Sequence, residues 1–231
     1  MGTSRMNVVR PAFYALAPGG WRDYVTLLHP PYTAWHLSYV VLGAALAPQW
    51  RPGILGLALA AFFLGMGVGA HALDELRGRP LQTRIGATML VALAAVSLLA
   101  ATAIGVGTAL ETDLWLLAFV GGGAFIAIAY NLELFGGRFH STLWFALAWG
   151  ALPVLATFFA AAHAIRPEAA AAAVFAAVVS WVQRVLSTPV RAMRRREGRL
   201  GGTALDAERA LRLLSAAMVA LAVALVLARV T

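Results

Sequence analysis

The sequence predicts an all-α integral membrane protein, a polytopic helical bundle with about seven transmembrane helices. Of the 231 residues, 61% are hydrophobic and only 12% are charged, whereas a soluble globular domain carries about 25% charged residues. The mean hydropathy is +0.78. The apolar runs are separated by short loops that hold the basic residues, which is the pattern of membrane topology.

Charge and cysteine usage exclude several classes of protein. The net charge of +8 is spread over the loops, so we expect contacts with membrane lipids and no nucleic-acid partner. All 18 basic residues are Arg and the chain has no Cys. This composition excludes lysine Schiff-base chemistry, disulfides and thiolate metal sites.

We expect a single membrane domain over residues 1–231, with 1–32 as a cytoplasmic or interfacial segment and 33–231 as the transmembrane bundle. Pro30 and Pro31 break any helix before them and suit the first turn of the next one. Runs long enough to approach or cross a bilayer follow. The seven spans are expected over 33–48, 53–73, 85–110, 114–132, 142–165, 169–186 and 205–228.

Small residues and prolines predict local features of these spans. Gly65 and Gly69 form a small-xxx-small pair that lets another helix approach closely. Pro153 is expected to kink the fifth span, which a helical bundle tolerates. Pro189 is expected to end the sixth span, so that residues 191–199 form a basic loop.

The distribution of arginine predicts the orientation. Arg51, Arg166 and Arg229 fall on one side of the predicted bundle, and the remaining loop arginines, together with those of the N-terminal segment, fall on the other. The positive-inside rule places the richer side in the cytoplasm. We therefore expect a plasma membrane protein with its N-terminus inside and its C-terminus outside.

The stretch from Ala70 to Pro80 carries the densest group of ionisable residues. His71, Asp74 and Glu75 stand at i, i+3 and i+4, so they share one helix face. Ionisable groups at the edge of a membrane helix are costly unless they are paired, bound to a metal or hydrated, and they commonly mark a functional site. The alternative is an ordinary helix end whose arginines are topology signals.

Most polar residues of the predicted spans fall at the same, cytoplasmic end. Imidazole and carboxylate together suit Fe, Mn or Zn, whereas carboxylate alone suits Mg. Helix bundles build carboxylate-bridged metal centres from such residues. The candidate metal ligands are His29, His36, His71, Asp74, Glu75, Glu133 and His140.

Two stretches give the chain a resemblance to the UbiA superfamily of intramembrane prenyltransferases, over about residues 22–217. The first signature of that family, Asn-Asp-x-x-Asp-x-x-x-Asp, matches Ala70, His71, Asp74 and Gly78, so only Asp74 is kept. The second signature matches the region of Glu197-Gly198 and Thr203, with arginines in place of its aspartates.

The resemblance implies a helical bundle with a central cavity that opens near the cytoplasmic side, and a prenyl diphosphate bound through Mg. A tyrosine at the end of the fourth span, here Tyr130, also belongs to the pattern. The implied catalytic residues are Asp74, Glu75, Tyr130 and Arg138. The implied substrate-binding residues are Arg77, Arg79, Asn131 and Arg199.

Three functions remain open from the sequence. The first is a prenyltransferase-type enzyme that acts on an isoprenoid or other lipid-like substrate. The second is a membrane metalloenzyme of another type, with oxidative chemistry among its options and Fe, Mn or Zn in a centre of histidines and carboxylates. The third is a non-catalytic membrane protein with a UbiA-like fold. Substrate, metal, oligomeric state and protein partners are not predicted.

Overall fold

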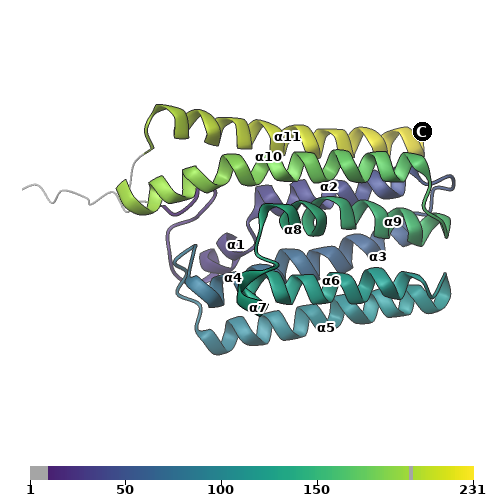
Figure 1. Ribbon diagram of the computed structural model, residues 1–231, viewed down its shortest axis with the longest axis horizontal. Helices are drawn as coiled ribbons and strands as arrows, with labels where there is room; N and C mark the ends of the chain where they lie inside the picture. Colours follow the sequence, from purple (N-terminus) through teal and green to yellow (C-terminus); the bar gives the residue numbers. More distant parts are fainter. Residues whose placement is uncertain (1–9, 198–199) are drawn as a thin grey trace, which may run out of the picture.

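The computed structural model describes residues 10–197 and 200–231, and all regular structure in these ranges is helical (Figure 1). The predicted all-α fold class is confirmed. The helices are α1 (Trp21–Leu27), α2 (Pro30–Leu46), α3 (Pro52–Phe62), η1 (Phe63–Ala70), α4 (His71–Gly78), α5 (Ala87–Glu111), α6 (Leu116–Asn131), α7 (Leu134–Gly137), α8 (Thr142–Ala146), η2 (Leu147–Ala151), α9 (Leu152–Ala162), α10 (Pro167–Glu197) and α11 (Gly202–Val230).

Five continuous helical stretches in the described residues are long and apolar enough to cross a membrane: Pro52–Gly78, Ala87–Glu111, Thr142–Ala162, Pro167–Arg196 and Gly202–Val230. Helices α2 and α6 are shorter, with 17 and 16 residues, near the lower limit for a span. The chain is therefore consistent with an integral membrane protein. A count of seven spans stays a prediction, because it depends on α2 and α6.

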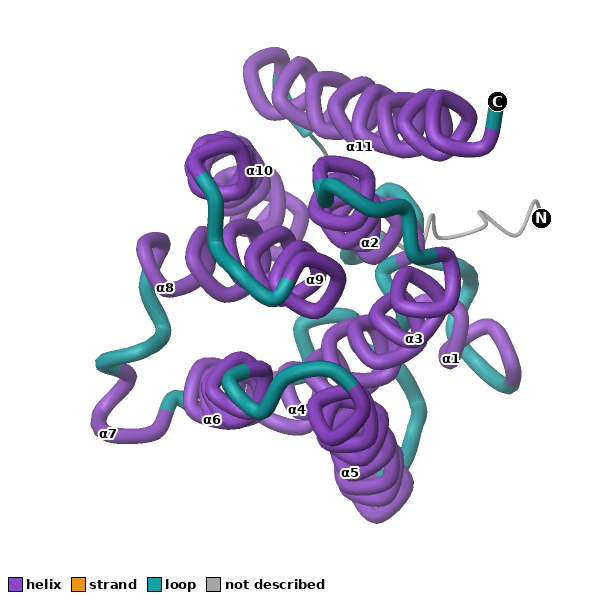
Figure 2. The backbone as a smooth tube through the Cα atoms, turned by 90° about the vertical axis from the view of Figure 1, so that its right-hand side faces the viewer, coloured by secondary structure: helices purple, strands orange, loops and turns teal. Residues whose placement is uncertain are grey.

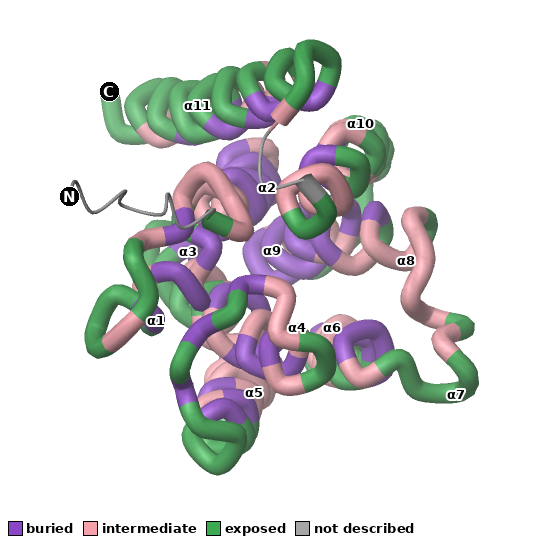
Figure 3. Tube along the Cα trace, turned by 90° about the vertical axis from the view of Figure 1, so that its left-hand side faces the viewer, coloured by how far each residue is buried: buried purple, intermediate pink, exposed green. Residues whose placement is uncertain are grey.

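The core is built around α2 and α9. Both helices are largely buried, while on the outside of the bundle α11 exposes most of its residues and α5 buries only a few (Figures 2 and 3). Gly43 of α2 makes the close approach possible, because a Cβ at this position would collide with the backbone of Val154 in α9. Trp35 and Tyr39 of α2 belong to the same buried cluster as Val154 of α9.

One end of the bundle collects the arginines and is called the basic end below. It is formed by α1, α4, the C-terminal part of α10 and the N-terminal part of α11, on the left in Figure 1. The segment 10–20, which has no regular helix, lies at this end. Arg194 donates to the carbonyl of Arg10 at 3.2 Å, and Arg212 stacks on the ring of Phe13 at 4.7 Å.

The expectation that Pro189 ends the sixth span is wrong. Helix α10 continues through Pro189 to Glu197, so most of the predicted basic loop is helical. The buried face of the helix continues past the proline through Ser187 and Val190, and Arg194 is paired with Glu208 of α11 at 2.5 Å. Packing on both sides of the proline outweighs the loss of one backbone hydrogen bond.

Two spans contain π-helical segments, which are rare and often occur at functional sites. Segment η1 connects α3 to α4, and η2 connects α8 to α9. Segment η2 ends shortly before Pro153, where the sequence predicts a kink, and the helix continues through this proline as α9. Segment η2 packs tightly on α10, because a Cβ on Gly150 would stand 2.5 Å from the carbonyl oxygen of Ala176.

Candidate functional site

Polar side chains from five parts of the chain meet inside the basic end. We call this group the polar cluster: Tyr14, His29, His71, Asp74, Tyr130, Arg184 and Arg191. It draws on the N-terminal segment, the start of α2, the helix α4, the end of α6 and the second half of α10. The cluster was predicted in part, since His29, His71, Asp74 and Tyr130 were candidates from the sequence.

The rings of His29 and His71 stack at the centre of this cluster. Their centroids are 4.0 Å apart and their planes differ by 11°. His29 adopts a left-handed backbone conformation directly before Pro30, and this turn carries its ring toward α4. The Tyr14 hydroxyl shares a hydrogen bond of 2.8 Å with His29 Nδ1, so the N-terminal segment closes over the pair.

Burial keeps both groups at this contact neutral. Burial raises the pKa of Tyr14 well above 10.0, with Tyr32 adding to the rise and Arg191 opposing it. Burial lowers the pKa of His29 well below 6.5, with smaller contributions from His71 and Arg191. A neutral phenol can donate its proton to Nδ1. The remaining ring proton of His29 is then on Nε2, and this buried atom has no hydrogen-bond partner among the described residues.

Three other histidines are held by backbone carbonyls. Nδ1 of His36 donates to Trp149 O at 2.9 Å, Nδ1 of His71 to Gly67 O at 3.0 Å, and Nδ1 of His140 to Tyr130 O at 3.0 Å. A carbonyl can only accept, so Nδ1 of each ring carries a proton, and in the neutral form of the imidazole Nε2 is the nitrogen that can act as a base or ligand. Two of these carbonyls belong to the π-helical segments η1 and η2.

Glu75, predicted as catalytic and metal-binding, is turned into the loop after α4. Its side chain is fully buried. The carboxylate accepts from Leu81 N at 2.9 Å, Thr83 N at 2.8 Å and Thr83 Oγ1 at 2.9 Å. Arg79 closes the same loop by donating to Ile85 O at 2.6 Å. Glu75 and Arg79 therefore have a structural role in this loop. The carboxylate of Glu75 is bound there, whereas that of Asp74 belongs to the polar cluster.

Asp74 stays with the polar cluster. It is half-buried, and the strongest charge–charge interaction on its carboxylate comes from Arg191, followed by His140. Its place on α4, three residues after His71, puts both on one helix face as the sequence predicted. Asp74 is the one residue of the first signature that this sequence keeps, and in the structure it lies near a histidine.

The remaining candidates are spread over the basic end. Arg77 donates to Glu133 at 3.3 Å, and both side chains are largely exposed. Asn131 is buried and donates to Ala127 O at 2.7 Å within its own helix. Arg138 is exposed. Arg199 lies outside the described residues.

The predicted metal ligands do not converge in the part of the chain that the structure describes. No group of three histidine, aspartate or glutamate side chains is arranged there to hold a metal ion. His71 was expected to approach His36 or His140, but its ring stacks on His29. Glu133 was expected to approach Asp74, but its carboxylate bonds Arg77. The metal centre stays a prediction that this geometry does not support.

Sequence analysis missed Arg184. This residue lies in the apolar part of α10, where its guanidinium donates to the Tyr130 hydroxyl. It also stacks over the rings of Tyr130 and Phe145, at 5.6 and 5.5 Å. A charged side chain within a predicted span (169–186) is the signal that would have identified it.

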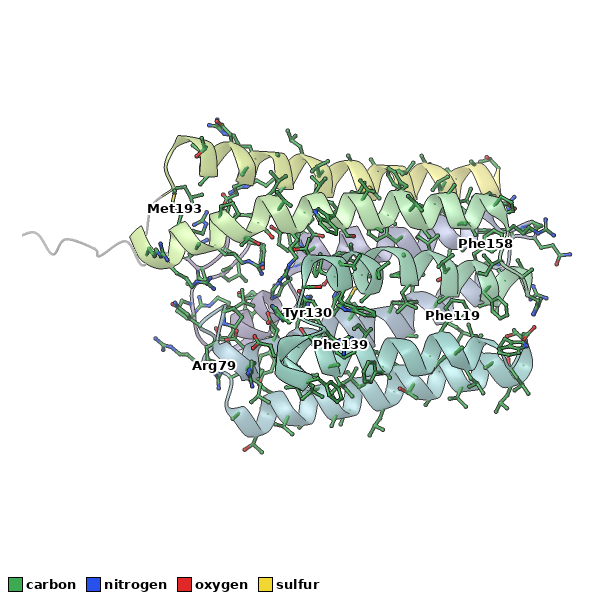
Figure 4. The ribbon with its side chains drawn as sticks, in the orientation of Figure 1. Arg79, Phe119, Tyr130, Phe139, Phe158 and Met193 are labelled. Carbon is green, nitrogen blue, oxygen red and sulfur yellow. The ribbon has the colours of Figure 1, made fainter. Side chains whose placement is uncertain are left out.

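An apolar cavity of about 140 Å³ lies beside the polar cluster. It is bounded by α3 and η1, α5, α6 and the η2–α9 segment, with residues such as Met66, Ala127 and Trp149 in its wall. The ring of Trp149 contacts that of Tyr130, with centroids 4.7 Å apart. In Figure 4, Tyr130 lies deeper along the bundle than Arg79 and Met193, which mark the basic end. One aromatic layer thus separates the cavity from Arg184.

The site joins a hydrophobic compartment to a group of cations, imidazoles and one carboxylate. Such a pairing suits a molecule with an apolar tail and a charged head. Compared with known protein families, with curated proteins and with solved structures, the chain matches none of them.

Proposed function

We propose that this chain is an enzyme of the plasma membrane, similar in kind to the UbiA prenyltransferases, that acts on an isoprenoid or other lipid-like substrate. The observation that carries the proposal is the apolar cavity that ends at Trp149, next to Tyr130 and Arg184. The tail of the substrate would lie in the cavity and its anionic head in the polar cluster. The polar cluster would face the cytoplasm.

The cavity suits a short apolar segment. Its volume of about 140 Å³ is close to that of engineered cavities that bind benzene. One isoprene unit is about as large as benzene, so the cavity can hold one such unit. Its wall is almost entirely apolar, and α5 and α6 leave residues such as Leu99 and Phe125, each next to a residue of the wall, exposed on the outside of the bundle. A longer tail would therefore extend from the cavity into lipid.

In a prenyl transfer, the bond between the first carbon of the chain and the diphosphate oxygen breaks, and the diphosphate leaves with the electron pair. Positive groups must stabilise that leaving group. A new bond then forms between the carbon and an acceptor, which gives up a proton. Nε2 of His71, free of its proton in the neutral tautomer, is the base that the cluster offers for this step.

The donors present do not fit the Mg ions that the family resemblance implies. Mg prefers carboxylate oxygens. Glu75 is committed to the loop amides, and Glu133 is paired with Arg77, so Asp74 is the single candidate carboxylate left in the cluster. No step is therefore assigned to a metal.

The test is diphosphate release from farnesyl diphosphate by the purified protein in nanodiscs, with a membrane lipid extract as the source of acceptor. Ala127→Phe fills the cavity wall and should abolish release. Ile128→Phe is the matched control, because Ile128 is exposed and does not line the cavity. The proposal fails if the wild type releases no diphosphate, or if the two variants behave alike. Iron or zinc copurifying in stoichiometric amount would favour the metalloenzyme instead.

A further inference from the structure

We propose that Arg184 and Arg191 of α10 form a phosphate-binding site that holds the anion directly, without a metal ion. This inference deepens the proposed function by naming how the charged head is recognised. It does not require the transfer reaction, because a phosphate can bind whether or not a bond is broken.

The placement of the two arginines on α10 is the first argument. The buried residues of this helix repeat with a spacing of three and four, as Ala169, Ala173, Ala176, Ser180, Gln183, Ser187 and Val190. Arg184 directly follows the buried Gln183, and Arg191 directly follows the buried Val190. Both arginines therefore lie along the same edge of the buried face of α10. Seven residues correspond to about 10 Å along the helix, a distance that two long side chains can close around one anion.

The second argument concerns charge. An arginine within a membrane helix is costly unless its charge is compensated. Neither Arg184 nor Arg191 has a carboxylate within 4.0 Å among the described residues, whereas Arg194 on the same helix is paired with Glu208. Among the described residues, the guanidinium of Arg184 donates to the uncharged phenol of Tyr130 and stacks on the rings of Tyr130 and Phe145. An anionic ligand would supply the missing negative charge.

The third argument is an unused hydrogen-bond donor on His29, a ring on which Arg191 acts. Nε2 of His29 is buried without a partner, and Arg191 is one of the charges that act on this ring. Buried polar atoms normally have a hydrogen-bond partner. With Tyr14 donating to Nδ1, the Nε2 proton is available to an acceptor such as a phosphate oxygen.

The chemistry of guanidinium fits this task. Its planar fork of donors matches two oxygens of a phosphate, and its charge persists at any physiological pH. The carboxylate of Asp74 opposes these charges, and both Arg191 and Arg184 act on it. Glu75 also acts on Asp74, but its own carboxylate is held by the N–H groups of Leu81 and Thr83, so the residues of the polar cluster itself are two arginines and one aspartate. The site therefore favours a phosphate or diphosphate group.

The experiment measures binding of inorganic pyrophosphate to the purified protein in neutral detergent with excess EDTA, by calorimetry. We expect the wild type to bind, and Arg184→Gln and Arg191→Gln each to weaken binding by roughly 10- to 100-fold, the usual effect of losing a charge-assisted contact. Arg195→Gln is the matched control, since Arg195 is an exposed arginine of the same helix. Its affinity should match that of the wild type.

A second arm replaces pyrophosphate with phosphatidic acid in phosphatidylcholine nanodiscs. Binding of pyrophosphate identifies a site for free phosphates, and binding in the nanodisc arm alone identifies a lipid headgroup. Binding only when Mg is added, or equal binding by the wild type, Arg184→Gln and Arg191→Gln, would overturn the inference. If Arg184→Gln does not fold, Arg184→Lys keeps the charge but loses the fork, and should bind at least about tenfold more weakly.

The two proposals fail separately. Pyrophosphate binding in EDTA without diphosphate release would reject the transferase and keep the arginine site. Diphosphate release that requires Mg and is unchanged in Arg191→Gln would reject the arginine site and keep the transferase.

Discussion

The imidazole of His29 lies flat against that of His71, with the two centroids 4.0 Å apart. The contact joins the turn before α2 to the first residue of α4, and Tyr14 covers it from the N-terminal segment. Two imidazolium ions cannot share this place, because like charges at such a distance in a buried site repel strongly. The contact therefore requires that at least one ring stays neutral.

This requirement predicts a dependence of stability on pH. The pKa of His29 is lowered well below 6.5 in the folded protein, so below pH 6.5 the unfolded chain binds a proton that the folded protein does not. Stability should then fall as the pH decreases from 6.5 to 5, by up to about 1.4 kcal/mol per pH unit for this one group. Above about pH 7.5 the contribution is constant.

The measurement is the unfolding temperature in detergent and EDTA between pH 5 and 8. His29→Gln should flatten the decrease below pH 6.5. His163→Gln, at an exposed position at the opposite end of the bundle, should leave it unchanged. Parallel curves for the wild type and His29→Gln would show that His29 titrates normally.

The carboxylate of Glu75 predicts a purely structural effect. Glu75→Gln removes the charge and places an amide near the N–H groups of Leu81 and Thr83, which need acceptors. We expect a loss of about 1–3 kcal/mol in stability, measured as a lower unfolding temperature. Pyrophosphate binding should be unchanged.

Glu133→Gln serves as the control for this variant. Glu133 forms an exposed pair with Arg77, and such pairs contribute about 0–1 kcal/mol. If Glu75→Gln were as stable as Glu133→Gln, the loop contacts would not have the role described.

Most of the helical layout was predictable from the sequence. Apolar runs and their polar ends locate α3 to α6 and α11 within a few residues, because a bilayer sets the length of a span. The C-terminal end of α10 was less predictable. Pro189 breaks a helix by local rules, but the contact of Arg194 with Glu208, fourteen residues later, depends on how α10 and α11 pack.

The candidate site was less predictable than the fold. His71 and Asp74 share a face as their spacing indicates, yet the same spacing gave no sign that Glu75 turns into the loop after α4. Its three hydrogen bonds come from residues six and eight positions later, in a loop without a recognisable motif. Arg184 was visible in the sequence, but its importance depends on Tyr130, which only the fold brings to it.

The approach of η2 to α10 predicts a strong effect of one methyl group. A Cβ on Gly150 would stand 2.5 Å from Ala176 O and 2.8 Å from Ser180 Oγ, so Gly150→Ala must push the two helices apart. We expect a loss of about 1–3 kcal/mol, measured by thermal unfolding. Gly122→Ala is the control, since nothing lies within 4 Å of a Cβ there. Equal unfolding temperatures for the two variants would contradict this packing.

The orientation of the bundle can be tested by cysteine labelling, because the chain has no Cys. Glu111 and Gly78 are exposed near opposite ends of the bundle. On intact cells, a membrane-impermeant maleimide should label Glu111→Cys and leave Gly78→Cys unlabelled until the membrane is permeabilised. The reverse pattern would place the basic end and the N-terminus outside.

The same method tests the number of spans, which depends on the short helices α2 and α6. Gln49, after α2, and Arg138, after α6, are both exposed. If both helices cross the membrane, Gln49→Cys should be labelled from outside together with Glu111→Cys, and Arg138→Cys should be protected together with Gly78→Cys. Labelling of Arg138→Cys on intact cells would mean that α6 does not cross. Tyr130 and the arginines of α10 would then no longer share the cytoplasmic side that the proposed substrate site requires.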